Sequence, residues 1–106
     1  MKANRNWINI PENIEYPSNG ILSKKMEFEN QPNGFETTLF CMSSGSELSE
    51  HTSTRKGILY VLEGSGVFNL GKEKIKMLPG TLIHMKENTI HSLAAETKLS
   101  FILLLL

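Results

Sequence analysis

The chain of 106 residues has one cysteine, no excess charge of either sign and few aromatic side chains. A single cysteine, Cys41, rules out an internal disulfide, so nothing argues for an oxidising compartment. Eleven Lys and Arg residues balance eleven Asp and Glu residues, which leaves no electrostatic footprint for nucleic acid or for an acidic membrane surface. We therefore expect neither nucleic acid nor a membrane among the partners of this protein.

Long hydrophobic runs are missing as well. The run FILLLL at residues 101–106 is far too short to span a bilayer and is expected to be a buried strand. The first ten residues, MKANRNWINI, contain no apolar segment of the kind found in signal peptides. These absences predict a cytoplasmic protein.

Helical periodicity is the third absence, because no stretch of about ten residues shows it without an interruption. Short apolar segments separated by glycine and proline turns predict about eight to ten strands instead. The sequence therefore predicts one all-β domain over residues 1–106, built as a barrel or sandwich. Residues 1–20 are expected to form an N-terminal arm or edge strand, and residues 39–106 the motif-bearing part of the barrel.

Turn and proline signals place the expected strands. Asn33-Gly34 is a hairpin signal. Ile10 precedes Pro11 and is expected to be extended, at the end of a short strand that begins near Trp7. Gly64 and other turn glycines are expected at positions that need positive φ. Further strands are expected at residues 21–29, 35–43, 57–63, 67–70, 74–78, 81–85, 90–94 and 99–106, with a polar loop or irregular strand at residues 46–56.

Two of these strands are apolar on both faces, at residues 57–63 and 99–106. Such strands lie centrally in a sheet and need cover on both sides. Their outer faces favour a homodimer, and Tyr60 is expected to pack on such an outer face or at a dimer contact.

Two stretches of the sequence contain the same elements: a glycine, an apolar strand and a histidine. In residues 45–64 a glycine is followed by the isolated His51, an apolar strand and a second glycine. In residues 80–96 a glycine is followed by an apolar strand, a polar turn and His91. A histidine in a polar loop is more often solvated than a ligand, and one at the start of a strand more often makes a single backbone hydrogen bond. The repetition favours a shared pocket.

The first stretch resembles the first motif of the cupin superfamily, G-x5-H-x-H-x3,4-E-x6-G. Gly45, His51 and Gly64 match its first glycine, first histidine and last glycine, while Ser53 and Gly57 stand where the second histidine and the glutamate are expected.

The second stretch resembles the second motif, G-x5-P-x-G-x2-H-x3-N. Gly80 and His91 match its glycine and histidine, while Lys86, Asn88 and Ala95 replace its proline, second glycine and asparagine. The resemblance covers nearly the whole chain and implies a cupin-type β-barrel, also called a double-stranded β-helix or jelly roll.

The resemblance implies a ligand pocket at His51, Ser53, Gly57 and His91. Typical metal cupins hold one divalent ion with three histidines and a glutamate, and only His51 and His91 carry over as metal ligands. Ser53 is a weak neutral ligand, and Gly57 offers no side chain, which is expected to widen the pocket. His84 becomes a third ligand if its strand face is the barrel interior, and is a surface or interface histidine if it is not.

Three functions remain open, and no catalytic residue is identified. The sequence favours a barrel that binds a small molecule in a metal-free pocket over one that holds Fe, Mn, Ni or Zn. The second alternative is a metal-dependent oxygenase or isomerase with a non-standard ligand set, and the third is a dimeric structural or interaction module. Arg55 at the pocket rim either meets an anionic ligand or, as we favour, is solvated; Cys41 is expected to be a buried, inert thiol.

Overall fold

The computed structural model of the protein describes residues 6–29, 31 and 34–106. The hairpin signal at Asn33-Gly34 therefore lies partly outside the described residues. A short 3-10 turn, η1, spans Pro11–Asn13, and nine strands follow in the described part of the chain. They are β1 (Ile21–Lys25), β2 (Glu36–Met42), β3 (Glu47–His51), β4 (Gly57–Glu63), β5 (Gly66–Leu70), β6 (Glu73–Met77), β7 (Leu82–Met85), β8 (His91–Ala95) and β9 (Leu99–Leu105).

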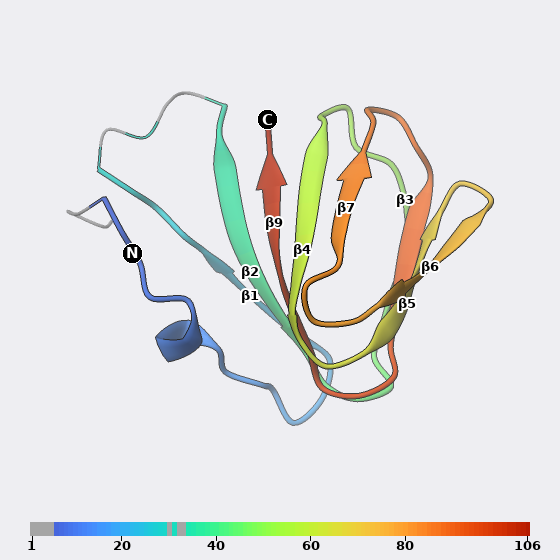
Figure 1. The fold of residues 1–106 in the computed structure, drawn as a ribbon, viewed down its shortest axis with the longest axis horizontal. Helices are drawn as coiled ribbons and strands as arrows, with labels where there is room; N and C mark the ends of the chain where they lie inside the picture. The colour runs from blue at the N-terminus through green and yellow to red at the C-terminus, as the bar shows by residue number, and fades with distance from the viewer. Residues whose placement is uncertain (1–5, 30, 32–33) are drawn as a thin grey trace.

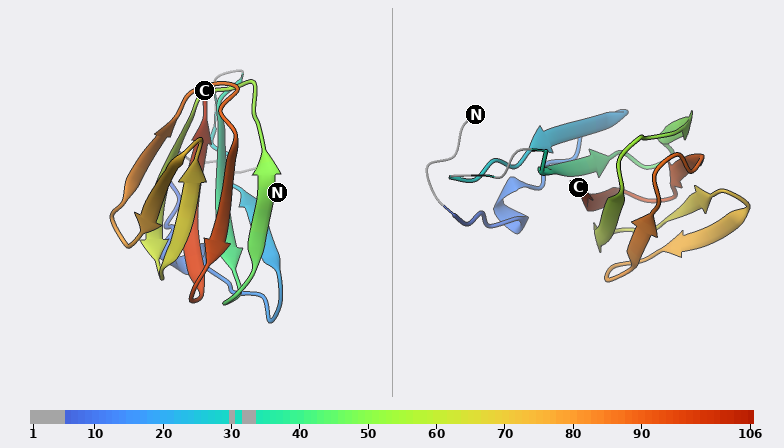
Figure 2. Two further views of the ribbon diagram at one scale, coloured as in Figure 1. Left: turned by 90° about the vertical axis from the view of Figure 1, so that its right-hand side faces the viewer. Right: turned by 90° about the horizontal axis from the view of Figure 1, so that it is seen from above.

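The strands form two antiparallel sheets that face each other (Figures 1 and 2). The first has the order β1-β2-β9-β4-β7 and the second the order β3-β8-β5-β6. Strands β4 and β9 are central in the first sheet, as their apolar faces predict. The predicted all-β barrel is confirmed. No helix in the described part of the chain is long and apolar enough to cross a membrane.

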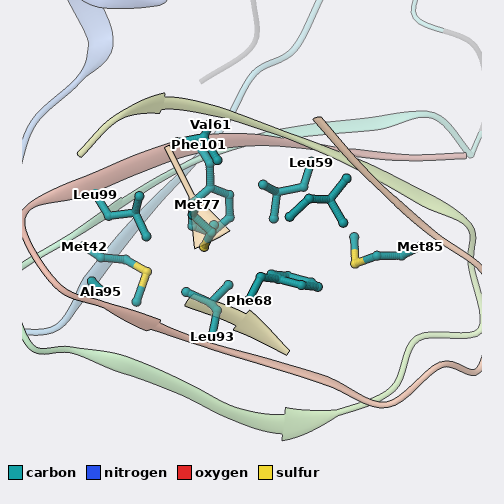
Figure 3. Close-up of a cluster of buried hydrophobic side chains, with 11 residues drawn as sticks. Met42, Leu59, Val61, Phe68, Met77, Met85, Leu93, Ala95, Leu99 and Phe101 are labelled. Carbon is teal, nitrogen blue, oxygen red and sulfur yellow. The ribbon is translucent and has the colours of Figure 1, made fainter. Parts of the chain in front are cut away.

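The barrel interior is filled by one side-chain parity of each strand. Burial alternates along β7, for example, where Ile83 and Met85 point inward and Leu82 and His84 point outward. Large apolar side chains from both sheets meet between the two layers (Figure 3). The buried cluster consists of Met42, Leu59, Val61, Phe68, Met77, Ile83, Met85, Leu93, Ala95, Leu99 and Phe101.

The N-terminal arm differs from the short strand expected before Pro11. Ile10 has φ −64° and ψ −47°, which is a helical rather than an extended conformation. The amide of Asn13 donates to the Ile10 carbonyl at 2.9 Å, and the amide of Glu12 donates to Asn9 Oδ1 at 3.1 Å. These local hydrogen bonds outweigh the preference for extended backbone that Pro11 imposes on its predecessor. The prediction of a strand here was wrong.

The arm covers part of the outer face of the first sheet. A second buried cluster lies there, on β2 and at the residue that follows β1, and the arm residues Ile8, Ile10, Ile14 and Tyr16 pack against it. That cluster consists of Met26, Leu39 and Cys41.

Tyr16 fastens the arm to the sheet. Its hydroxyl lies 2.6 Å from Glu63 Oε1 and 3.0 Å from the buried Ser100 Oγ. Burial and the hydrogen bond to Glu63 raise the pKa of Tyr16 to about 12. The chain itself thus supplies part of the cover that the sequence assigned to a second copy.

Part of this outer face stays exposed. Tyr60 and Leu82 form a cross-strand pair between β4 and β7, with exposed fractions of 44% and 66%. The next pair along the same strands is Ile58 and His84. Cover by a second copy is still a prediction for this smaller area.

Candidate functional site

Four strand ends meet at one end of the barrel, which we call the mouth. His51 ends β3, Gly57 begins β4, Met85 ends β7 and His91 begins β8. The two loops between these strands are tied together, because the amide of Asn88 donates to the Ser53 carbonyl at 2.7 Å. The mouth lies at the end of the barrel where β9 finishes, at the top of Figure 1.

A β-bulge brings the two histidines together. Leu48 of β3 pairs with Leu93 of β8, and a regular ladder would then place Glu50 opposite His91. The register shifts between Leu48 and His51, so that His51 takes that place instead. The extra residue re-aims the strand, as bulges commonly do beside functional sites. The two imidazole rings lie 4.1 Å apart, centroid to centroid, at an interplanar angle of 65°.

Both imidazoles are held through Nδ1. The Nδ1 atom of His51 lies 2.8 Å from the Ser49 carbonyl oxygen, and that of His91 lies 3.0 Å from the Thr89 carbonyl oxygen. A carbonyl oxygen only accepts, so each Nδ1 carries the proton. In the part of the chain that the structure describes, neither Nε2 has a hydrogen-bond partner. In the neutral form of each ring, Nε2 therefore keeps its lone pair.

His91 is the more enclosed member of the pair. Its ring stacks on Phe68, with 5.8 Å between centroids and 10° between ring planes. Burial lowers the pKa of His91, a hydrogen bond to the Thr89 carbonyl opposes this, and the neighbouring His51 adds to the lowering. His91 is therefore neutral at neutral pH.

This pKa shift predicts how stability depends on pH. In the unfolded chain His91 takes up its proton near its ordinary pKa of about 6.5, before the folded protein does so. The free energy of unfolding should consequently fall as the pH drops through that value. Replacing His91 with glutamine should make the loss between about pH 7.5 and about pH 5 smaller than in the wild type. Urea unfolding at the two pH values measures this, with His84→Gln as the matched control; equal losses in the wild type and in His91→Gln would contradict the shift.

The expected widening at Gly57 is not found. A side chain added at Gly57 would begin 2.9 Å from the terminal methyl carbon of Met85 and 3.3 Å from a methyl carbon of Leu105. Gly57 itself is buried and pairs with both residues across the sheet. The flexible thioether side chain of Met85 therefore fills the space that the missing side chain leaves.

The residues of the β3–β4 loop have local partners. The Ser53 hydroxyl accepts a hydrogen bond from the Arg55 amide at 3.1 Å, so it stabilises the loop. Arg55 donates to Glu36 Oε1 at 2.7 Å and to the Leu105 carbonyl at 3.2 Å. Its side chain is 28% exposed, and these contacts fix the loop to the start of β2 and the end of β9.

The third histidine is not part of the mouth. His84 is exposed on the outer face of β7, while its neighbours Ile83 and Met85 point into the barrel. The sequence left open whether His84 faces the barrel interior or the surface, and in the structure it faces the surface. His84 is therefore not placed to join His51 and His91 as a third ligand, because β-strand side chains alternate between the two faces.

A separate groove of about 380 Å³ lies along β3, β8 and β5 of the second sheet. It is lined by residues 47–50 of β3, residues 92–94 of β8 and Asn69 of β5. Asn69 donates to Ser92 Oγ at 3.1 Å across its floor. The groove shares strands with the mouth but contains neither histidine.

The donor set does not fit the divalent ion that typical cupins hold. Within residues 6–29, 31 and 34–106, no group of three or more His, Cys, Asp or Glu side chains is placed to hold a metal ion. Zinc and iron sites use three or more imidazole, carboxylate or thiolate ligands, and the mouth offers two imidazoles. The carboxylate position holds Gly57, backed by Met85.

The fold and the glycine-framed histidine strands define a small antiparallel β-barrel of the double-stranded β-helix class. The chain belongs to the cupin domain family, whose pattern matches residues 38–106. No curated protein matches this chain.

Solved structures show the same barrel. A cupin superfamily protein from Desulfitobacterium hafniense aligns with a TM-score of 0.85 and 20% identity, over 100% of this chain and 97% of that one. A protein of unknown function from Streptococcus pyogenes aligns with a TM-score of 0.83 and 18% identity, over 98% and 89%. A mutant of salicylate 1,2-dioxygenase from Pseudoaminobacter salicylatoxidans aligns with a TM-score of 0.75 and 17% identity, over 81% of this chain and 26% of that one. At these identities the likeness shows the fold alone.

Sequence reasoning missed two side chains of the mouth. Phe68 and Met85 are apolar residues on apolar strands, and nothing in their types distinguishes them from other core residues. Alternation gave one usable signal, because Met85 ends a strand just before a polar turn and shares its parity with Ile83. A flexible side chain at that place faces the end of the barrel.

Proposed function

We propose that the protein binds a small molecule at the mouth of its barrel, through the Nε2 atoms of His51 and His91. The observation that carries the proposal is the cross-strand histidine pair with both Nδ1 atoms anchored on carbonyl oxygens. In the neutral form with the proton on Nδ1, each Nε2 accepts hydrogen bonds and donates none. The ligand is therefore a molecule that carries hydroxyl or other donor groups.

The residues around the histidine pair indicate the apolar part of the ligand. Phe68 stacks on His91, and the buried Met85 lies against Gly57 at the start of β4. An apolar wall with a few placed polar atoms is the usual composition of a small-molecule site. We expect a small, planar, largely apolar molecule whose donors face the two imidazoles.

Catechol is a suitable probe, because it carries two adjacent hydroxyl donors on an apolar ring. NMR spectra of the histidine ring signals during a catechol titration should show shifts at His51 and His91 and none at His84, which lies outside the mouth. 1,2-Dimethoxybenzene keeps the ring and lacks the donors, so it should bind at least about tenfold more weakly. Equal shifts at all three histidines, or equal binding of both probes, would sink the proposal.

A second candidate is metal binding with a non-standard ligand set, as in a metal-dependent oxygenase or isomerase. The hydrogen bonds at Nδ1 favour it, because metal-binding histidines commonly donate their other ring N–H to a carbonyl or carboxylate. Elemental analysis of the purified protein separates the two candidates: near-stoichiometric Fe, Mn, Ni or Zn favours the second.

A homodimer is also proposed, through the exposed pair Tyr60 and Leu82 on the outer face of β4 and β7. Leu82→Glu would place a carboxylate in that apolar contact and should weaken association at least about tenfold. Leu78→Glu is the matched control, because Leu78 is 45% exposed but lies in the turn before β7. Light scattering measures the mass; a monomeric wild type at high concentration would rule out the dimer.

A further inference from the structure

The outer face of the second sheet has charged residues on both edges and short side chains between them. The core takes one side-chain parity of β5, β6 and β8, so the residues that alternate with it point away from the barrel. On β3, Leu48 packs against the core, and Glu47 before it is exposed. The outward side chains of the other three strands are Val67, Asn69, Lys74, Lys76, Ser92 and Ala94.

One row of paired residues crosses this face from a carboxylate to an ammonium group. Glu47 on β3 pairs with Ala94 on β8. Ala94 pairs with Val67 on β5, and Val67 pairs with Lys76 on β6. Strands β3 and β6 are the two edges of the sheet, so this row is acidic at one edge and basic at the other.

The β-bulge in β3 gives a second row the same polarity. Between the two flanking pairs, β3 has two residues, Ser49 and Glu50, where β8 has only Ser92. Ser92 pairs with Asn69, and Asn69 pairs with Lys74 on β6. Both rows therefore run from a glutamate on β3 to a lysine on β6.

The charges at the two edges are not paired within the chain. In the part of the chain that the structure describes, no hydrogen-bond or ion-pair partner is found for the side chains of Glu47, Glu50, Lys74 and Lys76. The groove of about 380 Å³ lies at the acidic edge and is lined by both glutamates and by no basic residue. An ammonium group, which carries a positive charge and three donors, matches these acceptors.

A second copy of the chain can supply the ammonium groups. If two such sheets face each other about 10 Å apart, a two-fold axis parallel to the strands reverses the strand order and keeps each row at its position along the strands. Strand β6 of one copy then lies over β3 of the other, so that Lys76 meets Glu47 and Lys74 meets Glu50. A two-fold axis across the strands would set β3 over β3, with like charges together. The charge pattern therefore selects the first arrangement.

We propose that a second copy of this chain docks on the outer face of the second sheet, with Lys74 and Lys76 of each copy in the groove of the other. The methylene stems of the lysines lie over the short side chains of Ala94 and Val67, and their ammonium groups reach the glutamates. The inference goes beyond the proposed function, because it uses neither the mouth nor the outer face of the first sheet. Exposed ion pairs contribute little one by one, so the dimer is weak and depends on salt.

Sedimentation velocity in a Leu82→Glu background tests this contact alone, because that substitution weakens the dimer proposed at the first sheet. We expect a monomer–dimer equilibrium at an ionic strength of about 0.01 M, where the Debye length is about 30 Å. At about 1 M, where the Debye length is about 3 Å, the chain should be monomeric. The apolar contact at Tyr60 and Leu82 does not weaken with salt in this way, so ionic strength separates the two interfaces.

Charge reversal at one edge at a time gives the sharpest comparison. Glu47→Lys with Glu50→Lys makes both edges basic, and Lys74→Glu with Lys76→Glu makes both edges acidic. Each double variant should associate with itself at least about tenfold more weakly than its parent. Mixed in equal amounts, the two variants should form a heterodimer, because each edge then faces the opposite charge. All four positions are exposed, so the core is unchanged, and the heterodimer itself reports that both chains are folded.

Glu12→Lys with Glu87→Lys is the matched control for the basic variant. It changes the net charge by the same amount, at η1 and in the loop after β7, away from the second sheet. Its self-association should equal that of the parent. If the control dissociates as the basic variant does, net charge and not the pairing of edges governs the association, and the inference fails.

Three other results would overturn the inference: a Leu82→Glu chain that stays monomeric at low ionic strength, double variants that still associate with themselves, or a mixture that forms no heterodimer. Putrescine that shifts the amide signals of Ser49 and Glu50 in a monomeric chain would assign the groove to a small organic cation instead. The proposed function is tested separately, since catechol is expected to shift His51 and His91 at the mouth in monomer and dimer alike.

Discussion

Replacing Gly64 with alanine is expected to lower the free energy of unfolding by at least about 4 kcal/mol. Gly64 follows β4 with φ +88°, and an added Cβ would overlap the carbonyl oxygen of Lys98 and lie 2.8 Å from its carbonyl carbon. Both neighbours are backbone atoms, so the contact is relieved only if the chain before β9 moves away from the end of β4. Urea unfolding followed by circular dichroism measures the loss.

Gly80→Ala is the matched control for Gly64→Ala. Gly80 has φ +93°, but a Cβ there would meet no heavy atom within 4 Å. Its cost should be the backbone strain alone, about 1–3 kcal/mol. Equal losses in the two variants would show that strain, and not the contact with Lys98, limits the turn at Gly64.

The second large effect is expected for Phe68→Ala, with a loss of about 3–5 kcal/mol. Phe68 is 1% exposed in the core cluster, and its removal leaves a cavity directly beneath the His91 ring. Phe68→Leu keeps most of the volume and should cost about 1.5 kcal/mol or less. Urea unfolding measures both variants.

Phe68→Ala also tests the support of the site. With the stacking partner gone, the ring signals of His91 should broaden or move, while those of His84 on the outer face should not change. A loss of unfolding free energy below about 1 kcal/mol, or unchanged ring signals of His91, would contradict the role of Phe68 as the residue that supports the His91 ring.

Most of the fold could be predicted from the positions of the glycines and from the periodicity of the strands. Gly64 and other turn glycines were expected at positions that need positive φ, and Gly64, Gly71 and Gly80 have φ values of +88°, +59° and +93°. Asn88, at the position of a motif glycine, also has positive φ, 65°. Asparagine tolerates this conformation better than most residues do, so the turn survives the substitution.

The arm and the bulge could not be predicted in the same way. The 3-10 turn at Pro11 depends on hydrogen bonds between neighbouring polar groups, which compete with the propensity of each single residue. The bulge before His51 depends on how β3 pairs with β8. A register shift is a property of two strands together, so the spacing of residues in one strand does not reveal it.

The candidate site was predicted in part, for the same reason. His51 and His91 were recognised from their place in glycine-framed strands, and the structure brings them together. The content of the pocket at Gly57 depends on a cross-strand neighbour, Met85, that is far away in sequence. Packing between strands therefore decides whether the glycine leaves open space or whether a neighbouring side chain fills it.

The tautomers of the histidines test the central claim most directly, that His51 and His91 present two bare Nε2 atoms at the mouth. Long-range proton–nitrogen NMR at about pH 7.5 reports which ring nitrogen carries the proton. The hydrogen bonds to the Ser49 and Thr89 carbonyls predict that the neutral form of each ring carries its proton at Nδ1. A proton on Nε2 of either ring would contradict the account, since that ring would then have no lone pair to offer a ligand.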